Sequence, residues 1–361
     1  MFERKEINFM EMNRQIIKEE KRIDVIDRVK GIGILCIVFG HVFPMTIFTQ
    51  WLFSFHVPLF FLVSGFTYRF DSNKKRFFGK KLCRLMVPYI SFSIISILLL
   101  WAMAKVLPVD EETRILPNLT GMLWGNSNGR AMAWNTPLWF LPCIFCSLAL
   151  MDLFETVLKR ADNSYCLLLR LAFVGICWTV GIILNTGSSV YLPWHLETAV
   201  FLVGFSELGL VLRQWGIGTK RNLSARSILI LTVIGIAASM LNGWTDIRTH
   251  TLGHHSILLI VTAVCFSCAV FGVSEKLGRC SWLSYVGLHS ISILVMHKFP
   301  ILFFRELIPG VQELLNRPAH PAGIVCGLAI TVVTVGLCLL AEKIIMAVFP
   351  IAFGLPSAKR R

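Results

Sequence analysis

The sequence predicts an all-α fold, a polytopic membrane bundle of about ten transmembrane helices. Of the 361 residues, 55% are hydrophobic and only 16% are charged, and the mean hydropathy is +0.68. Charged residues make up about a quarter of an ordinary soluble domain. The apolar residues gather in runs of roughly 20, the length that a helix needs to cross a bilayer. Most Lys and Arg residues fall between these runs, which is typical of a multi-pass membrane protein.

Ten apolar runs predict ten spans. The first two form a hairpin joined at Gln50, and the tenth is long enough to tilt or to extend beyond the bilayer. In chain order, the predicted spans cover residues 31–49, 51–69, 84–105, 134–154, 166–186, 193–212, 226–242, 256–273, 283–304 and 322–348.

The segments outside the spans are short. Residues 1–30 are polar and lack the apolar core and cleavage site of a signal peptide, so we expect a cytosolic N-terminal tail. Residues 31–350 form the predicted transmembrane domain, and residues 351–361 a basic cytosolic tail. The largest predicted outer loop, at 106–133, is too short for an independent domain.

Basic residues set the predicted orientation. They concentrate in the N-terminal tail, in the 69–84 loop and in alternate segments thereafter, among them the 155–170 region, which ends at Arg170. By the positive-inside rule both termini are cytoplasmic, and an even number of spans agrees. The formal charge of +14 is therefore explained by topology, and we expect no nucleic-acid partner. The two Cys-x-x-Cys pairs lie inside apolar runs, so we interpret them as packing residues and expect no metal site.

His41 is the most informative residue, because it lies near the middle of the first span. Lys30 precedes it by eleven residues, which puts both side chains within roughly 20° of one helix face and about 16 Å apart along the axis. Lys30 would lie at the membrane surface. An ionisable group at mid-bilayer is costly and indicates function. The alternative is a histidine bonded to a neighbouring helix for packing.

Further polar residues lie in the middle or outer half of the predicted bilayer. His56, Glu197 and His297 could orient an imidazole or bind a polar substrate, and Ser64 follows His56 two turns later. Interfacial or packing roles are the alternatives. We expect Glu207, deeper in the sixth span, to extend toward the cytoplasmic surface. Lys80, Lys81 and Arg84 precede the third span and fit either anionic-lipid contact or a cytosolic phosphate site.

Five stretches of the chain match sequence blocks of a known family. They are DRVKGIGILCIVFGH at 27–41, FHVPLFFLVSGF at 55–66, KKLCRLMVPY at 80–89, PLWFL at 137–141 and LSYVGLHSISILVMH at 283–297. The chain thereby resembles the acyltransferase 3 family of integral-membrane acyltransferases over about residues 25–350. It is most similar to the branch of fucose 4-O-acetylases and the O-acetyltransferase of enterobacterial common antigen. Many family members carry arginine where this chain has Lys30, so the charge is kept and the bidentate fork is lost.

The resemblance implies O-acetylation of a carbohydrate or glycolipid in a bacterial-type inner membrane, with acetyl-CoA or another acyl-CoA as donor and no metal. It assigns His41 as the essential histidine and Lys30 as its cationic partner. It assigns Lys80, Lys81 and Arg84 to the donor. His41 would act as general base or as a covalent acyl carrier. The acceptor sugar and the oligomeric state are not indicated. The alternatives are a transporter or flippase, and a membrane sensor that has lost activity.

Overall fold

The computed structural model describes residues 24–43, 49–105, 112–125, 132–159, 165–187, 191–217, 222–317 and 320–354. Within these ranges the fold is built from helices and short connections, with one isolated antiparallel bridge between Asp246 and Thr251. The all-α class is therefore confirmed. Most of both predicted cytosolic tails lies outside the described residues.

The first described helix covers residues 24–42, so helical structure begins before the predicted start of the first span. The α-helices that follow are α2 (Gln50–Phe53), α3 (His56–Phe66), α4 (Lys74–Lys81), α5 (Val87–Met103), α6 (Ile115–Trp124), α7 (Phe140–Leu158), α8 (Cys166–Thr186), α9 (Leu196–Gln214), α10 (Ala225–Asn242), α11 (Ser256–Lys276), α12 (Ser281–Leu288), α13 (Ser290–Met296), α14 (Lys298–Leu307), α15 (Val311–Leu315) and α16 (Pro321–Val348).

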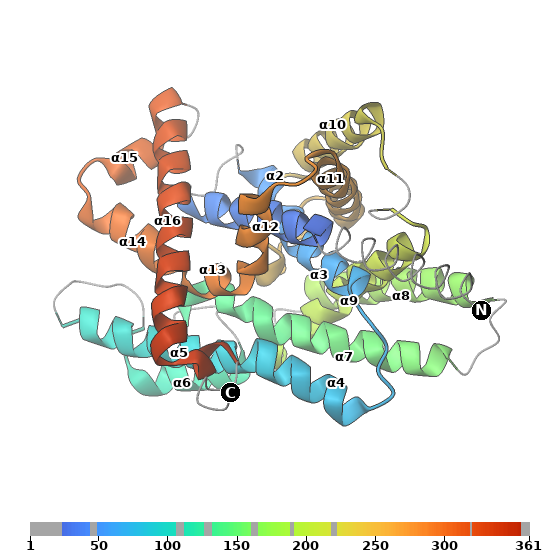
Figure 1. Cartoon of the computed structure of the whole chain (residues 1–361), viewed down its shortest axis with the longest axis horizontal. Coiled ribbons are helices and arrows are strands. Elements are labelled where there is room, and N and C mark those ends of the chain that lie inside the picture. Colours follow the sequence, from blue (N-terminus) through green and yellow to red (C-terminus); the bar gives the residue numbers. More distant parts are fainter. Residues whose placement is uncertain are drawn as a thin grey trace, which may run out of the picture.

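Seven helices of the described chain are long and apolar enough to cross a membrane. They coincide with the predicted third to eighth spans and with the tenth. Helix α9 is the central one, because 83% of its apolar window is buried, against 22% in α8 and α10. Figure 1 shows α4 and α5 following one another along one edge, with α7 beside them and α16 running across the view. The polytopic bundle predicted from hydropathy is thus confirmed.

Two of the predicted spans are not single helices. The second is divided into α2 and α3 around Ser54, whose hydroxyl bonds the Gln50 carbonyl at 3.2 Å and the Thr245 hydroxyl at 3.0 Å. The ninth is divided into α12, α13 and α14, with breaks at His289 and His297. Pro300 explains the second break, because its ring lacks an N–H and clashes with the carbonyl four residues earlier.

The N-terminal helix and the α12–α13 segment lie side by side (Figure 1). A Cβ atom on Gly31 would meet the Leu283 carbonyl oxygen at 2.3 Å, and one on Gly287 would lie 1.7 Å from the Asp27 carbonyl oxygen. Glycine at both contacts lets the backbones approach, as is common between membrane helices. Both segments then continue to a histidine ten residues later, His41 in one and His297 in the other.

A buried ion-pair network joins three of the long helices. Arg170 of α8 pairs with Glu155 of α7 and with Glu207 of α9, and all three residues are buried. The expectation that Glu207 extends to the cytoplasmic surface is therefore wrong, and Arg170 is a structural cation inside the bundle. Attraction between the opposite charges offsets the cost of removing them from water, which an unpaired buried charge would bear in full.

Candidate active site

A cavity of about 260 Å³ lies beside His41. Its wall comes from segments far apart in the sequence: the N-terminal helix, the start of α3, the α10–α11 connection, α14 and the 3₁₀ segment Ala133–Trp139. The chemically active side chains that line it are those of His41, His56, Thr136, Trp139, Asp246, Arg248, Lys298 and Arg305.

His41 and His297 are in direct contact. Nδ1 of His41 lies 2.7 Å from Nε2 of His297, and the two ring planes are within 3° of parallel with centroids 5.0 Å apart. Nδ1 of His297 lies 2.8 Å from the carbonyl oxygen of Leu294, and a carbonyl oxygen only accepts hydrogen bonds. Nδ1 of neutral His297 therefore carries the proton, and its Nε2 accepts a hydrogen bond from His41.

This hydrogen-bond chain fixes the tautomer of His41. Because Nδ1 of His41 donates to His297, Nε2 of a neutral His41 ring holds the lone pair. His41 is partly exposed and lines the cavity. The arrangement leaves the basic nitrogen of His41 available to a molecule in the cavity, which is the geometry that a general base needs.

His56 completes a group of three histidines. Its Nδ1 donates to the Leu52 carbonyl oxygen at 2.6 Å, so its Nε2 is also an acceptor when the ring is neutral. The His56 ring centroid is 6.5 Å from that of His41. The sequence placed these three histidines in three different predicted spans. The structure brings His41 and His56 to one cavity, with the buried His297 directly behind His41.

Charged residues surround the histidines. Arg248, Lys298 and Arg305 line the cavity together with a single carboxylate, that of Asp246. Arg248 pairs with Asp246 at 3.2 Å, and Arg305 donates to the Gln312 side chain at 2.8 Å. The wall therefore has an excess of positive charge, which favours ligands with negative charge or developing negative charge.

A second, larger cavity of about 820 Å³ lies over the α4–α5 junction. Lys80, Lys81 and Arg84 line it, as does Gly354 from the C-terminal segment. In the described part of the chain, none of these three cations forms an ion pair. The cluster is thus available for a polyanionic ligand.

Another pair of charges on the wall of the second cavity is already neutralised. Arg76 makes two hydrogen bonds to the Asp71 carboxylate, at 2.7 and 2.9 Å. These bonds lower the pKa of Asp71, which stays ionised and compensates Arg76. Asp71 therefore compensates Arg76 and forms no ion pair with the Lys80–Arg84 cluster.

The backbone at the second cavity departs from a regular α-helix. Residues Leu82–Met86 form a π-helical turn between α4 and α5, a feature often found at functional sites. Gly354 has a φ of +69°, and a Cβ atom there would lie 1.7 Å from the Cys83 carbonyl oxygen. Only glycine combines that left-handed backbone with so close an approach.

Three predicted site residues lie away from both cavities. Lys30 pairs with Asp27 of its own helix at 2.6 Å. Ser64 lies between helices, 3.3 Å from the Ser206 hydroxyl. Glu197 belongs to a separate cluster with His195 and His250. The structure therefore does not bring Lys30, Ser64 or Glu197 into contact with His41.

One family model matches most of the chain. The model of the acyltransferase 3 family, described as an acyltransferase domain, matches residues 23–342. The chain belongs to the acyltransferase 3 family. The match includes His41, His56, His297 and the Lys80–Arg84 cluster. Of the residues that line the two cavities, only Gly354 lies outside this acyltransferase domain. Comparisons with curated proteins and with solved structures give no match.

Sequence reasoning missed several residues of the cavity in this acyltransferase domain. Asp246 and Arg248 lie in a connection without a repeating pattern, and only the fold brings them to His41. The sequence does mark His297 and Lys298 as a polar pair near the outer end of the ninth predicted span, but it assigns Lys298 no role. Thr136 directly precedes the PLWFL block at 137–141 and Trp139 lies within it, but the resemblance assigned no role to either residue.

Proposed function

We propose that this acyltransferase moves an acetyl or other acyl group from acyl-CoA to a hydroxyl of a cell-surface carbohydrate or its lipid-linked precursor. The main support is the chain of bonds from Leu294 through His297 to His41, which leaves the basic nitrogen of His41 at a cavity. We place it in a bacterial-type cell membrane with both termini cytosolic, in the branch of fucose 4-O-acetylases and of the enterobacterial common antigen O-acetyltransferase.

The donor binds at the second cavity. Acyl-CoA carries several phosphate groups, and Lys80, Lys81 and Arg84 supply ammonium and guanidinium groups that make charge-assisted hydrogen bonds to phosphate. A volume of about 820 Å³ is in the range of small-molecule sites. The positive-inside rule puts this basic end of the bundle in the cytosol, where acyl-CoA is found.

The acceptor binds at the cavity of His41. Nε2 of His41 takes the proton from the acceptor hydroxyl while the oxygen attacks the thioester carbonyl. Arg248 and Lys298 lie on the same wall and stabilise the negative charge that develops on the carbonyl oxygen. The C–S bond then breaks, and the thiolate of CoA leaves with the proton returned by His41. In a second form of the reaction, His41 carries the acyl group covalently between the two substrates.

The proposal is tested with the full chain in nanodiscs and with acetyl-CoA labelled in the acetyl group. Wild type should release CoA and transfer label to an added glycolipid, whereas His41→Ala should do neither above background. His254→Ala is the matched control, since His254 is exposed and lies outside the cavity. If neither protein consumes acetyl-CoA while wild type binds or moves a glycolipid, the chain is a transporter and the proposal is wrong.

A further inference from the structure

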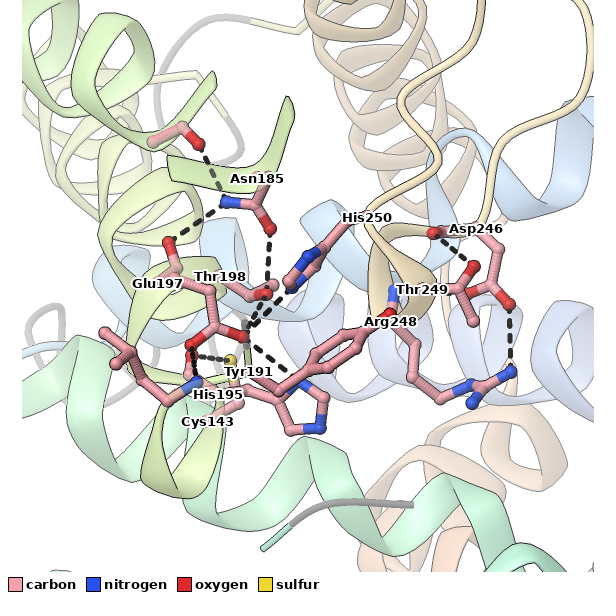
Figure 2. Close-up of polar contacts among 12 residues, drawn as sticks. Cys143, Asn185, Tyr191, His195, Glu197, Thr198, Asp246, Arg248, Thr249 and His250 are labelled. Carbon is pink, nitrogen blue, oxygen red and sulfur yellow. Dashed lines mark hydrogen bonds and ion pairs between the residues drawn. The ribbon is translucent and has the colours of Figure 1, made fainter. Parts of the chain in front are cut away.

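A second group of titratable side chains lies outside the His41 cavity. His195, Glu197 and His250 each offer one ligand atom, and these atoms lie within 4.8 Å of one another. Figure 2 shows both imidazole rings directed at the Glu197 carboxylate. Nε2 of His250 lies 3.0 Å from Oε1 of Glu197, and Nδ1 of His195 lies 3.6 Å from the same oxygen.

The buried imidazole of His195 has polar atoms that no hydrogen bond satisfies in the part of the chain that the structure describes. Its side chain is 0% exposed, and neither ring nitrogen has a hydrogen-bond partner in the described part of the chain. The 3.6 Å separation from Glu197 is too long for a hydrogen bond. A buried polar group without a partner costs about 1–3 kcal/mol. An ion between the two imidazoles and the carboxylate would satisfy His195.

We propose that His195, Glu197 and His250 bind one divalent transition-metal ion of the zinc class. Two imidazoles and one carboxylate are a donor set that zinc takes in proteins. Bonds of about 2.0–2.2 Å in a tetrahedral arrangement put neighbouring ligand atoms roughly 3.3 Å apart. The separations of 3.0 and 3.6 Å lie on either side of this value. Three protein ligands leave a fourth position for water.

The surroundings hold the ligands in place. Oε2 of Glu197 accepts a hydrogen bond from the Leu192 backbone N–H at 3.0 Å, so Oε1 is left to face the imidazoles. The Tyr191 ring lies 4.2 Å from that of His250, and the Trp139 ring 5.0 Å from that of His195, measured between centroids. Partners of this kind orient metal ligands and limit access of solvent.

The backbone at the cluster is also unusual. Trp194, His195 and His250 have φ values of 59°, 52° and 59°, and Met132 is the one other non-glycine residue with positive φ in the described chain. Such conformations cost about 1–3 kcal/mol each and persist where the surrounding structure requires them. Coordination of one ion by His195 and His250 would hold both residues in this backbone conformation.

The ion would join two walls of the His41 cavity. His250 belongs to the same short connection as Asp246 and Arg248, which line that cavity. His195 and Glu197 begin the central helix α9, and Trp139 lies both on the cavity wall and against His195. The ion therefore ties the α10–α11 connection to α9 and fixes the position of Arg248.

The test measures metal binding by the full chain. Protein purified through a tag without histidines is stripped with a chelator, dialysed and titrated with Co²⁺ or Zn²⁺. We expect saturation at one ion per chain, with zinc displacing cobalt and abolishing its visible absorption. His250→Ala and Glu197→Gln should weaken binding by about tenfold or more, and His254→Ala, from the same connection, should bind as wild type does.

His41→Ala is a second control, because His41 and His56 offer two imidazoles at the neighbouring cavity. It should retain the ion, whereas retention by His250→Ala together with loss in His41→Ala would assign the ion to the other site and overturn the proposal. If His250→Ala and Glu197→Gln do not fold, the proposal is tested by the Co²⁺ or Zn²⁺ titration of wild-type protein. Absence of saturable Co²⁺ or Zn²⁺ binding by folded wild-type protein would equally overturn it.

Discussion

Nδ1 of His41 and Nε2 of His297 lie 2.7 Å apart, although 256 residues separate them in the chain. Each histidine lies ten residues beyond a glycine at which the two segments touch, Gly31 in one and Gly287 in the other. The segments thus keep the same register from the glycine contact to the imidazole pair. Two sequence blocks that were recognised separately are two halves of one structural unit.

This relationship predicts that His297 positions His41 and sets its tautomer. His297→Leu removes the acceptor for the His41 Nδ1 proton, and we expect kcat to fall by about 10²-fold, as when a catalytic group is displaced. His297→Gln offers a side-chain oxygen that can accept the same hydrogen bond, so it should retain more activity than His297→Leu. Steady-state kinetics with acetyl-CoA measure both. Equal activity of the two variants would contradict the role.

Replacing glycine by alanine should lower thermal stability at the contact between the two segments and should not lower it at an open position on another helix. Gly287→Ala places a Cβ atom 1.7 Å from the Asp27 carbonyl oxygen, and should separate the two segments. Activity should be lost together with thermal stability. Gly336→Ala in α16 is the matched control, because its added Cβ would meet no described atom within 4 Å apart from its own helical turn. Alanine favours a helix by about 1 kcal/mol over glycine, so Gly336→Ala should melt at or above the wild-type temperature.

The proposed donor site predicts that loss of its cations raises KM only for donors that carry the nucleotide phosphates of CoA. Replacing Lys80, Lys81 and Arg84 together by Gln should raise KM for acetyl-CoA by about tenfold or more, because hydrogen bonds to charged groups contribute about 1.5–3 kcal/mol. KM for acetyl-pantetheine, which lacks the nucleotide, should change little. Arg317→Gln, on an exposed connection, is the control. A similar loss with both donors would show that the cluster serves folding instead.

The buried ion pairs predict a strong asymmetry. Arg170→Met leaves Glu155 and Glu207 without their shared cation, and should destabilise the protein by about 3–5 kcal/mol. Adding Glu155→Gln and Glu207→Gln to Arg170→Met removes both buried charges and should recover much of the loss. Thermal unfolding in detergent measures each variant. An Arg170→Met protein as stable as wild type would contradict the structural role.

Hydropathy predicted the fold class because apolar runs of fixed length are a local property of the chain. It did not predict the breaks at His289 and His297, because the length of an apolar run does not record where a helix is interrupted within it, as it is near Pro300. Glu207 was misplaced for a similar reason. Its partners, Arg170 and Glu155, come from other helices, and pairing across helices is not encoded by the position of one residue in a span.

The candidate site was predicted in part. Mid-membrane position singled out His41, and charge clustering singled out Lys80, Lys81 and Arg84, which line the second cavity. The contact between His41 and His297 needed the fold, as did the cations at the cavity. Lys30 was chosen from helical spacing alone, and the structure shows it paired with Asp27 at 2.6 Å. Its assigned catalytic role stays a prediction.

The most direct test of the account is a single turnover of acetyl-CoA by folded protein with His41 intact or replaced. Wild type and His41→Gln should bind acetyl-CoA alike, because His41 lies outside the donor cavity. CoA release in the presence of acceptor should then be slower in His41→Gln by about 10²–10⁴-fold, the usual contribution of general base catalysis. Release of CoA at the wild-type rate by His41→Gln would contradict the central claim.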